Sequence, residues 1–388
     1  MMKEIQNTVA NTFLELADAL ESGRFGAVKV AVTGIGSEHG EENVLQGAIM
    51  AAKRGVSVYF IGSIDVPENC GVTKVEAHDE DSCFAAMEKL LDSGEAQAAV
   101  AMHYPFPIGV ATVGRVVCPA NGREMFLATT TGTSATDLVE GLVRNAVAGI
   151  ATAKACGIEN PSVGLLNLNG ARQAEMVLKE LQEKGYEINF AESARSDGGM
   201  IMRGNDLLKG SADVMVMDTL TGNAIIKLFA AYSTGGSFET VGYGYGPGVG
   251  KGYDRKVLII SRASGAPLIA NALIYASDLV NGQLKEKVNA EIAAAEKAGL
   301  EGIIAARSKS AQAKDSAEEV VCPPAEPVAE QIAGIDVLDL EDAAKVLWKE
   351  KIYAETGMGC TGPIIRISAE NLARSRELLA AAGYIEEA

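Results

Sequence analysis

Short apolar runs alternate with longer amphipathic segments along most of the chain. The apolar runs are typical of strands buried on both faces of a sheet, and the amphipathic segments are typical of helices that cover such a sheet. The expected strands are residues 27–33, 56–61, 98–102, 163–168, 186–190, 212–218 and 256–261. The expected helices are residues 43–54, 82–93, 137–155 and 173–184. This alternation predicts an α/β fold with a mostly parallel sheet covered by helices on both faces.

Two glycine-rich segments interrupt this pattern. The loop at residues 34–40 follows the first expected strand, where α/β proteins place their ligands, but His39 stands where a dinucleotide fingerprint has its third glycine. Residues 235–252 contain a Gly-Lys pair at 250–251 without the first glycine or the magnesium-binding Ser or Thr of a P-loop. We interpret this second segment either as a mobile loop that closes over a substrate or as a flexible connector.

Hydroxyl groups gather in residues 129–136, ahead of the long helix expected from residue 137. The centre of this segment is Thr131, Gly132, Thr133 and Ser134. Because the first N–H groups of a helix lack backbone partners, the segment is a candidate site for an anion such as phosphate. The alternative is that Thr136 or Ser134 caps the helix and that no ligand binds.

A change in composition divides the chain near its C-terminus. Residues 305–331 are rich in Lys, Ser, Ala, Glu and Pro, and they predict a linker because they offer few apolar side chains to pack. The expected division is therefore a core at residues 1–304, this linker, and an extension at residues 332–388 with the order helix, turn, strand, helix.

The extension contains Cys360 within Gly357-Met358-Gly359-Cys360-Thr361-Gly362-Pro363. Glycines leave the backbone N–H groups around this thiol bare, and such groups stabilise a thiolate. Cys360 is therefore the candidate nucleophile, whereas a purely structural cysteine is more typical of an apolar run.

Charge and composition exclude several functions. The net charge of −17 argues against nucleic acids and anionic membranes as partners, since both bind clustered Lys and Arg. No apolar stretch reaches the roughly 20 residues of a spanning helix, and no apolar signal region begins the sequence, so we expect a cytoplasmic protein. Six scattered cysteines and three histidines make a structural zinc site or a disulfide framework unexpected. We expect no metal and no cofactor.

Three motifs of the core carry a family resemblance: Thr33-Gly34-Ile35-Gly36-Ser37-Glu38-His39-Gly40, then Gly157-Ile158-Glu159-Asn160-Pro161, and Asp218-Thr219-Leu220-Thr221-Gly222-Asn223-Ala224. With them, residues 27–285 resemble the acyl-carrier-protein:phosphate acyltransferase family of phospholipid synthesis. The resemblance implies a three-layer α/β/α fold like that of isocitrate dehydrogenase, and transfer of an acyl group from a thioester to inorganic phosphate. The family's apolar and basic membrane-contacting hairpin is absent, and Arg172 stands in the place of a family lysine.

The whole chain, including the segment around Cys360, is similar to the alpha subunits of component C of the glycine/sarcosine/betaine reductase complex of amino-acid-fermenting anaerobes. This resemblance implies that a carboxymethyl group arrives on the selenocysteine of component A and becomes an enzyme-bound acetyl thioester. Phosphate, the co-substrate, then cleaves it to acetyl phosphate. The implied partners are component A and the beta subunit of component C, and we expect the core to form a homo-oligomer.

Phosphorolysis of a thioester needs a thiol, an oriented phosphate and donors to the developing oxyanion. Cys360 is the candidate thiol, and the resemblance puts Asn223 in the active site as a donor. The phosphate candidates are Arg172, Lys227, His39 and residues 131–134. Asp218 either orients Asn223 or Lys227 or simply ends a strand.

Several alternatives remain open at this point. His39 acts as an acid or base or caps its own loop, and His103 is expected to pack in a rigid turn. The competing functions are a free-standing acyl-thioester:phosphate acyltransferase in which Cys360 is a bystander, and a non-catalytic scaffold for the beta subunit. A dehydrogenase is a further alternative by fold analogy alone.

Overall fold

The computed structural model describes residues 27–194, 199–315, 320–337, 339–359 and 362–385, together with Phe13. One half of its large sheet consists of five mutually parallel strands. They are β1 (Lys29–Thr33), β2 (Ser57–Gly62), β3 (Val72–Glu76), β4 (Ala98–Ala101) and β12 (Val257–Ile259). The helices of this half are α2 (Gly40–Lys53), α3 (Glu80–Ser93) and α8 (Ala266–Asn281).

The second half of the sheet is also parallel. Its strands are β6 (Glu124–Thr133), β7 (Ser162–Leu166), β8 (Asn189–Phe190), β9 (Ile201–Met202) and β10 (Val214–Val216). Its helices are α4 (Leu138–Ala155), α5 (Ala171–Glu183), α6 (Gly204–Lys209) and α7 (Thr219–Ala231), the last of which leads into a 3-10 turn, η1 (Tyr232–Thr234). All strands and helices expected from the apolar pattern are present, with ends that differ by a few residues.

Two strands join the halves and reverse the direction of the sheet. Within the described residues the order is β3–β2–β1–β4–β12–β11–β5–β6–β10–β7–β8, with β9 beside β7, β11 at Gly246–Gly250 and β5 at Val110–Val117. The pairings β12–β11, β11–β5 and β5–β6 are antiparallel, so the two parallel halves run in opposite directions.

The strand β11 corrects the interpretation of residues 235–252 as a mobile loop or connector. Residues 246–250 are instead a mostly buried strand at the centre of the sheet. A side chain at Gly246 would place its Cβ 1.7 Å from the carbonyl oxygen of Val113, so only glycine allows β11 to approach β5 this closely.

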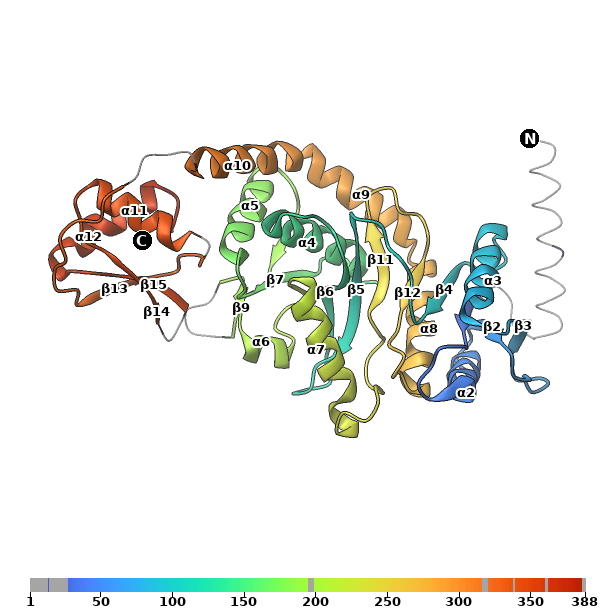
Figure 1. The fold of residues 1–388 in the computed structure, drawn as a ribbon. Coiled ribbons are helices and arrows are strands. Elements are labelled where there is room, and N and C mark those ends of the chain that lie inside the picture. The colour runs from blue at the N-terminus through green and yellow to red at the C-terminus, as the bar shows by residue number, and fades with distance from the viewer. Residues whose placement is uncertain are drawn as a thin grey trace.

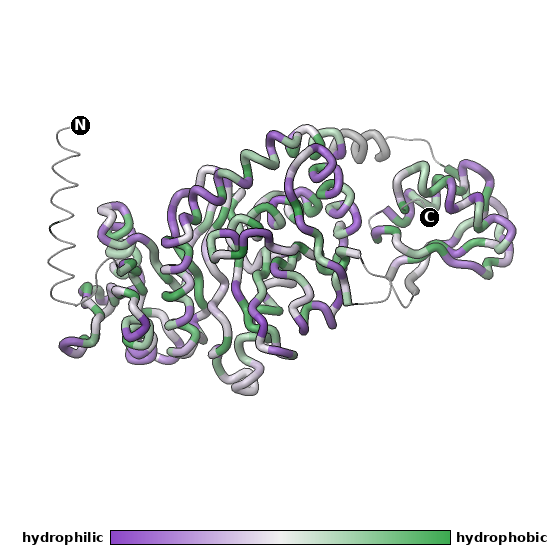
Figure 2. Tube along the Cα trace, turned by 180° about the vertical axis from the view of Figure 1, so that it is seen from behind, coloured by the Kyte–Doolittle hydropathy of each residue, from purple (hydrophilic) through white to green (hydrophobic). Residues whose placement is uncertain are grey.

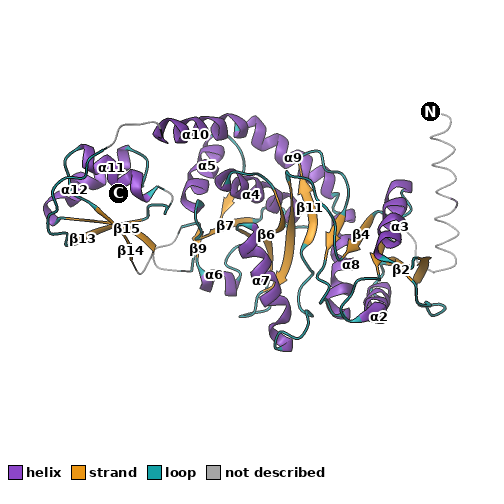
Figure 3. Ribbon diagram, viewed as in Figure 1, coloured by secondary structure: helices purple, strands orange, loops and turns teal. Residues whose placement is uncertain are grey.

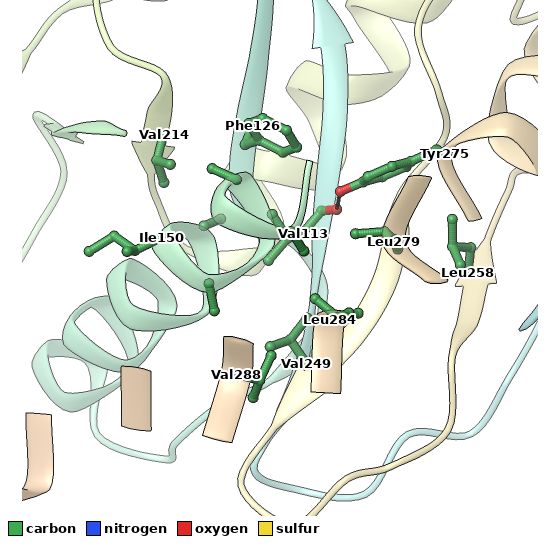
Figure 4. Packing of buried hydrophobic residues seen from close by; sticks show 14 of the residues in the cluster. Val113, Phe126, Ile150, Val214, Val249, Leu258, Tyr275, Leu279, Leu284 and Val288 are labelled. Atoms are coloured by element: carbon green, nitrogen blue, oxygen red, sulfur yellow. Dashed lines mark hydrogen bonds between the residues drawn. The ribbon is translucent and has the colours of Figure 1, made fainter. Parts of the chain in front are cut away.

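Helices cover both faces of the sheet (Figure 3). Apolar side chains of α2, α4, α5 and α8 pack on one face, together with α9 (Leu284–Lys297) and α10 (Leu300–Asp315). Figure 4 shows part of this core, where Tyr275 of α8 donates a 3.0 Å hydrogen bond to the carbonyl oxygen of Val113. The other face packs against α3, α6 and α7. The chain therefore has the α/β architecture that the sequence predicted.

The C-terminal extension has a separate small core. Its elements are β13 (Glu330–Ala333), α11 (Leu340–Lys349), β14 (Glu355–Gly359), β15 (Gly362–Ile367), η2 (Ala369–Asn371) and α12 (Leu372–Ala381). The three strands form an antiparallel sheet in the order β13–β15–β14, set apart from the large sheet (Figure 1). The extension thus begins with a strand, and α10 occupies residues 305–315 of the expected linker. Cys360 lies outside the described residues.

The outer helices alternate hydrophilic and hydrophobic residues along their length (Figure 2), as expected where one helix face is in water. Of the helices in the described part of the chain, none combines the length and the hydrophobicity that crossing a membrane requires.

Candidate functional site

A cavity of about 440 Å³ opens where the two halves of the sheet meet. The parallel neighbours β4 and β12 end at its edge, and the residues that follow them line it. The other half contributes Thr131 after the middle of β6, and Asn223 and Lys227 of α7. The remaining lining residues are Glu38, Met102, His103, Tyr104, Tyr245, Ile259, Ile260, Ser261 and Arg262. The volume is that of a small-molecule site.

The position of α7 depends on two residues at its start. Asp218 caps the helix, because its carboxylate accepts hydrogen bonds from the backbone N–H (3.0 Å) and the hydroxyl (2.6 Å) of Thr221. Gly222 lets the helix lie directly on β6, since a Cβ there would be 1.8 Å from the carbonyl oxygen of Thr129. Asn223 and Lys227 follow one turn apart on the side that faces the cavity.

Asn223 is anchored to the neighbouring strand. Its Nδ2 donates a hydrogen bond of 3.2 Å to the carbonyl oxygen of Thr130, which leaves the second hydrogen of this amide for another acceptor. The hydroxyls of Thr129 and Thr130 are occupied inside the protein, by Thr112 O (2.7 Å) and Tyr245 O (2.8 Å) respectively. Thr131 is thus the threonine of this run that lines the cavity.

Lys227 brings a positive charge to the cavity. Its ammonium group lies 3.5 Å from Glu239 Oε1 and 3.5 Å from Ser261 Oγ, and 5.7 Å from the centre of the Tyr245 ring. Burial lowers the pKa of Lys227, but its contacts with Tyr245 and Glu239 outweigh burial and the net shift is upward. Burial also raises the pKa of Glu239, and Lys227 offsets this only in part, because the Glu239 side chain is 8% exposed and that of Lys227 is 50% exposed.

His103 and Arg262 complete the polar edge of the cavity, and sequence reasoning did not identify either. His103 is exposed and lines the cavity, so the expectation that it packs in a turn was wrong. Arg262 holds Glu80 in a two-pronged ion pair of 2.8 and 2.7 Å, which lowers the pKa of that carboxyl. His103 lies two residues after β4 and Arg262 three residues after β12, and this position just after a buried strand is the signal that could have found them.

Three predicted site residues lie elsewhere or have another role. Asp218 forms no hydrogen bond with Asn223 or Lys227 in the described structure, because its carboxylate caps α7. His39 is exposed at the start of α2, makes no side-chain cap, and packs edge-on against Phe238 at 5.4 Å. Arg172 lies in the first turn of α5, pairs with Glu175 at 3.0 Å, and lines a different cavity of about 330 Å³ shared with the C-terminal extension.

The expected anion cradle before α4 does not form at a helix start. Residues up to Thr133 continue β6, and the cap of α4 is Asp137, which accepts a 2.8 Å hydrogen bond from the N–H of Glu140. The prediction of Thr136 or Ser134 as the cap was therefore wrong. Gly132 and Thr133 use their carbonyl oxygens to bind Thr219 and Gly109, and the Ser134 hydroxyl donates to Asn145 Oδ1 at 2.6 Å.

The described residues do not form a metal site. Among the described side chains, no three His, Cys, Asp or Glu residues gather closely enough to hold an ion.

Comparison with known proteins places the chain in a family. The family model described as "Fatty acid synthesis protein" matches residues 28–366. The chain belongs to this family. The chain is also similar to the component C subunit alpha of the glycine/sarcosine/betaine reductase complex from Peptoclostridium acidaminophilum, which is 54% identical over 387 residues, or 99% of this chain and 100% of the relative. The resemblance inferred from the sequence is confirmed.

More distant relatives of this chain are phosphate acyltransferases. The one from Thermotoga neapolitana is 26% identical over 235 residues, covering 52% of this chain and 68% of the relative. Among solved structures, a branched-chain phosphotransacylase from Enterococcus faecalis aligns with a TM-score of 0.45 at 18% identity, covering 65% of this chain and 99% of that one.

Proposed function

We propose that this chain transfers an acyl group from a thioester to inorganic phosphate, at the cavity around Asn223 and Lys227. The observation that supports this most is the meeting, in one small cavity, of an amide donor and a cation from α7 with a hydroxyl from the distant strand β6. The relatives named as phosphate acyltransferases and as a reductase component C subunit support the same class of reaction.

The reaction that we propose needs no redox partner. An oxygen of hydrogen phosphate attacks the thioester carbonyl carbon and forms a C–O bond, and the C–S bond then breaks with its electron pair on sulfur. The phosphate proton ends on the thiol, so the products are an acyl phosphate and a free thiol. Lys227 would hold the phosphate by charge, and the free N–H of Asn223 would stabilise the oxyanion.

We further propose that Cys360 carries the acyl group as a thioester before phosphate attacks it. This step rests on the glycine-rich sequence around Cys360, and the residue itself lies outside the described structure. Within a complex of the kind named for the Peptoclostridium relative, the acyl group would be acetyl, and a beta subunit and the selenoprotein component A would be the partners.

One observation favours a second candidate, a free-standing acyltransferase. All residues that line the cavity fall between Glu38 and Arg262, so the described C-terminal extension contributes none of them. In this alternative an external thioester enters the cavity directly, and Cys360 is not involved.

A single assay of the full-length chain tests the function and separates the two candidates. The assay follows acetyl phosphate formation from phosphate and the acetyl thioester of N-acetylcysteamine. We expect Lys227→Gln to lower kcat/KM for phosphate by about tenfold or more, a loss of about 1.4 kcal/mol of transition-state binding. Lys285→Gln is the matched control, because Lys285 does not line the cavity and its ammonium group lies 2.7 Å from Asp254 Oδ2.

Three outcomes decide the matter. Unchanged phosphate kinetics in Lys227→Gln would refute the proposed site. Loss of product in a folded Cys360→Ala variant supports the carrier role of Cys360, whereas full activity in that variant supports the free-standing acyltransferase.

A further inference from the structure

A second cavity of about 440 Å³ lies on the face of the sheet that α4, α9 and α10 cover. Ser134 and Lys251, which directly follow β6 and β11, line it. These two strands run opposite to β4 and β12, which end at the candidate site. Among the described residues, the two cavities have no lining residue in common. The volume is again that of a small-molecule site, separate from the one proposed for acyl transfer.

The floor of this second cavity is aliphatic. It is formed by side chains of α4, α9, α10 and β11, namely Val147, Ala151, Val288, Ile292, Leu300 and Val249. Figure 4 shows Val249 and Val288 next to each other, and both are buried. A hydrocarbon chain lying on this floor leaves water, and each methylene that it buries tightens binding by about fourfold. The floor therefore suits a ligand with an aliphatic chain.

The rim of the cavity carries a net positive charge. The charged side chains that line it are Glu140, Arg144 and Lys251, two cations and one carboxylate, in a chain whose net charge is −17. Arg144 donates from Nε to Glu140 at 2.7 Å and from Nη2 to Glu301 at 3.0 Å. These two pairs hold the guanidinium in place, and within the described residues its Nη1 makes no hydrogen bond. An anion at the rim can accept from Nη1 without breaking either pair.

We propose that this second cavity binds an aliphatic monocarboxylate such as octanoate, with its chain on the floor and its carboxylate at Arg144. A carboxylate matches the single net positive charge of the rim, whereas a phosphate group brings about two negative charges next to Glu140. The ligand is not the thioester of the proposed reaction, because α7 lines the candidate site from the opposite face of the sheet. The inference thus goes beyond the proposed function.

The test is isothermal titration calorimetry of the full-length chain with butanoate, hexanoate and octanoate. We expect one octanoate to bind per chain, and affinity to rise about 15-fold for each two methylenes added, because the floor buries them. Octanamide has the same chain length without the charge, so it should bind about tenfold more weakly than octanoate. Absence of saturable octanoate binding, or an affinity independent of chain length, would overturn the proposal.

Variants locate the ligand. Ala148 lines the cavity, so Ala148→Phe should fill it and abolish binding, whereas Ala293→Phe, on the exposed side of α9, should bind octanoate like the wild type. Arg144→Gln leaves the floor intact, so it should weaken octanoate about tenfold and leave octanamide unchanged. Lys227→Gln changes the other cavity and should bind octanoate normally.

Circular dichroism verifies that the variants are folded, and Arg144→Gln decides the matter if Ala148→Phe does not fold. Octanoate binding that survives both of these changes overturns the proposal. Binding that is lost in Lys227→Gln instead would put the carboxylate in the candidate site and also overturns it. None of these measurements requires acyl transfer, so failure here leaves the proposed function untouched.

Discussion

Replacing Gly222 with alanine should both loosen the packing of α7 on β6 and distort the cavity that α7 lines. The new Cβ would sit 1.8 Å from the carbonyl oxygen of Thr129, about 1.6 Å short of an ordinary 3.4 Å contact. The obstacle is backbone, so it has no rotamer by which to move aside, and α7 must retreat instead. Such overpacking costs about 3 kcal/mol, and the better helix propensity of alanine returns about 1 kcal/mol. We expect a net loss of about 2 kcal/mol, or a Tm lowered by about 2–3 °C.

The retreat of α7 would also break the 3.2 Å hydrogen bond from Asn223 to Thr130, so acyl phosphate formation should fall more than stability alone explains. Calorimetry and the acetyl phosphate assay, both well below the Tm, measure the two effects. Gly302→Ala is the control, because nothing lies within 4 Å of its Cβ and its helix should be slightly stabilised. A Gly222→Ala variant with wild-type Tm and activity would refute the close approach of α7 to β6.

Two further predictions concern ionisable groups. Burial raises the pKa of Asp213, but hydrogen bonds from Ser162 and the ion pair with Arg123 outweigh burial, so the net shift is downward. Asp213→Asn should therefore cost about 1–2 kcal/mol at neutral pH, and urea unfolding should show this difference shrinking below about pH 4; a pH-independent difference would contradict the prediction. Burial raises the pKa of Cys118 to about 11 and that of Cys156 to about 12. Iodoacetamide should therefore alkylate the exposed Cys322 well before either of them, as followed by mass spectrometry, and equal alkylation rates in the folded chain would contradict the burial of these two thiols.

The sequence predicted the parallel strands well because each is a buried apolar run. It failed at β11, where Gly-Pro-Gly-Val-Gly has almost no intrinsic preference for a strand. This segment is extended because β12 and β5 pair with it on either side, and its glycines allow that close pairing. No local pattern contains this information, since the two partner strands are about ten and 140 residues away.

In the candidate site too, local sequence predicted some residues and missed those whose position depends on the order of the strands. Asn223 followed from the family resemblance and Lys227 was a phosphate candidate, and the structure does bring them to one cavity with Thr131. Arg172 was assigned because it stands in the place of a family lysine that follows β7, but β7 lies on the far side of β10 from β6. His103 was missed for the converse reason, because only the sheet order brings the end of β4 toward the residues of α7.

The residues at the starts of α4 and α7 decide which group can supply the positive charge for a bound phosphate. A helix N-terminus attracts an anion through its unsatisfied N–H groups, but Asp137 and Asp218 already place carboxylates at the starts of α4 and α7. Neither start is available to phosphate. Arg262, the other cation at the cavity, is committed to Glu80 through two hydrogen bonds. Among the described residues Lys227 pairs with one carboxylate, Glu239, at 3.5 Å, so it is the cation that phosphate would recruit at the lowest cost.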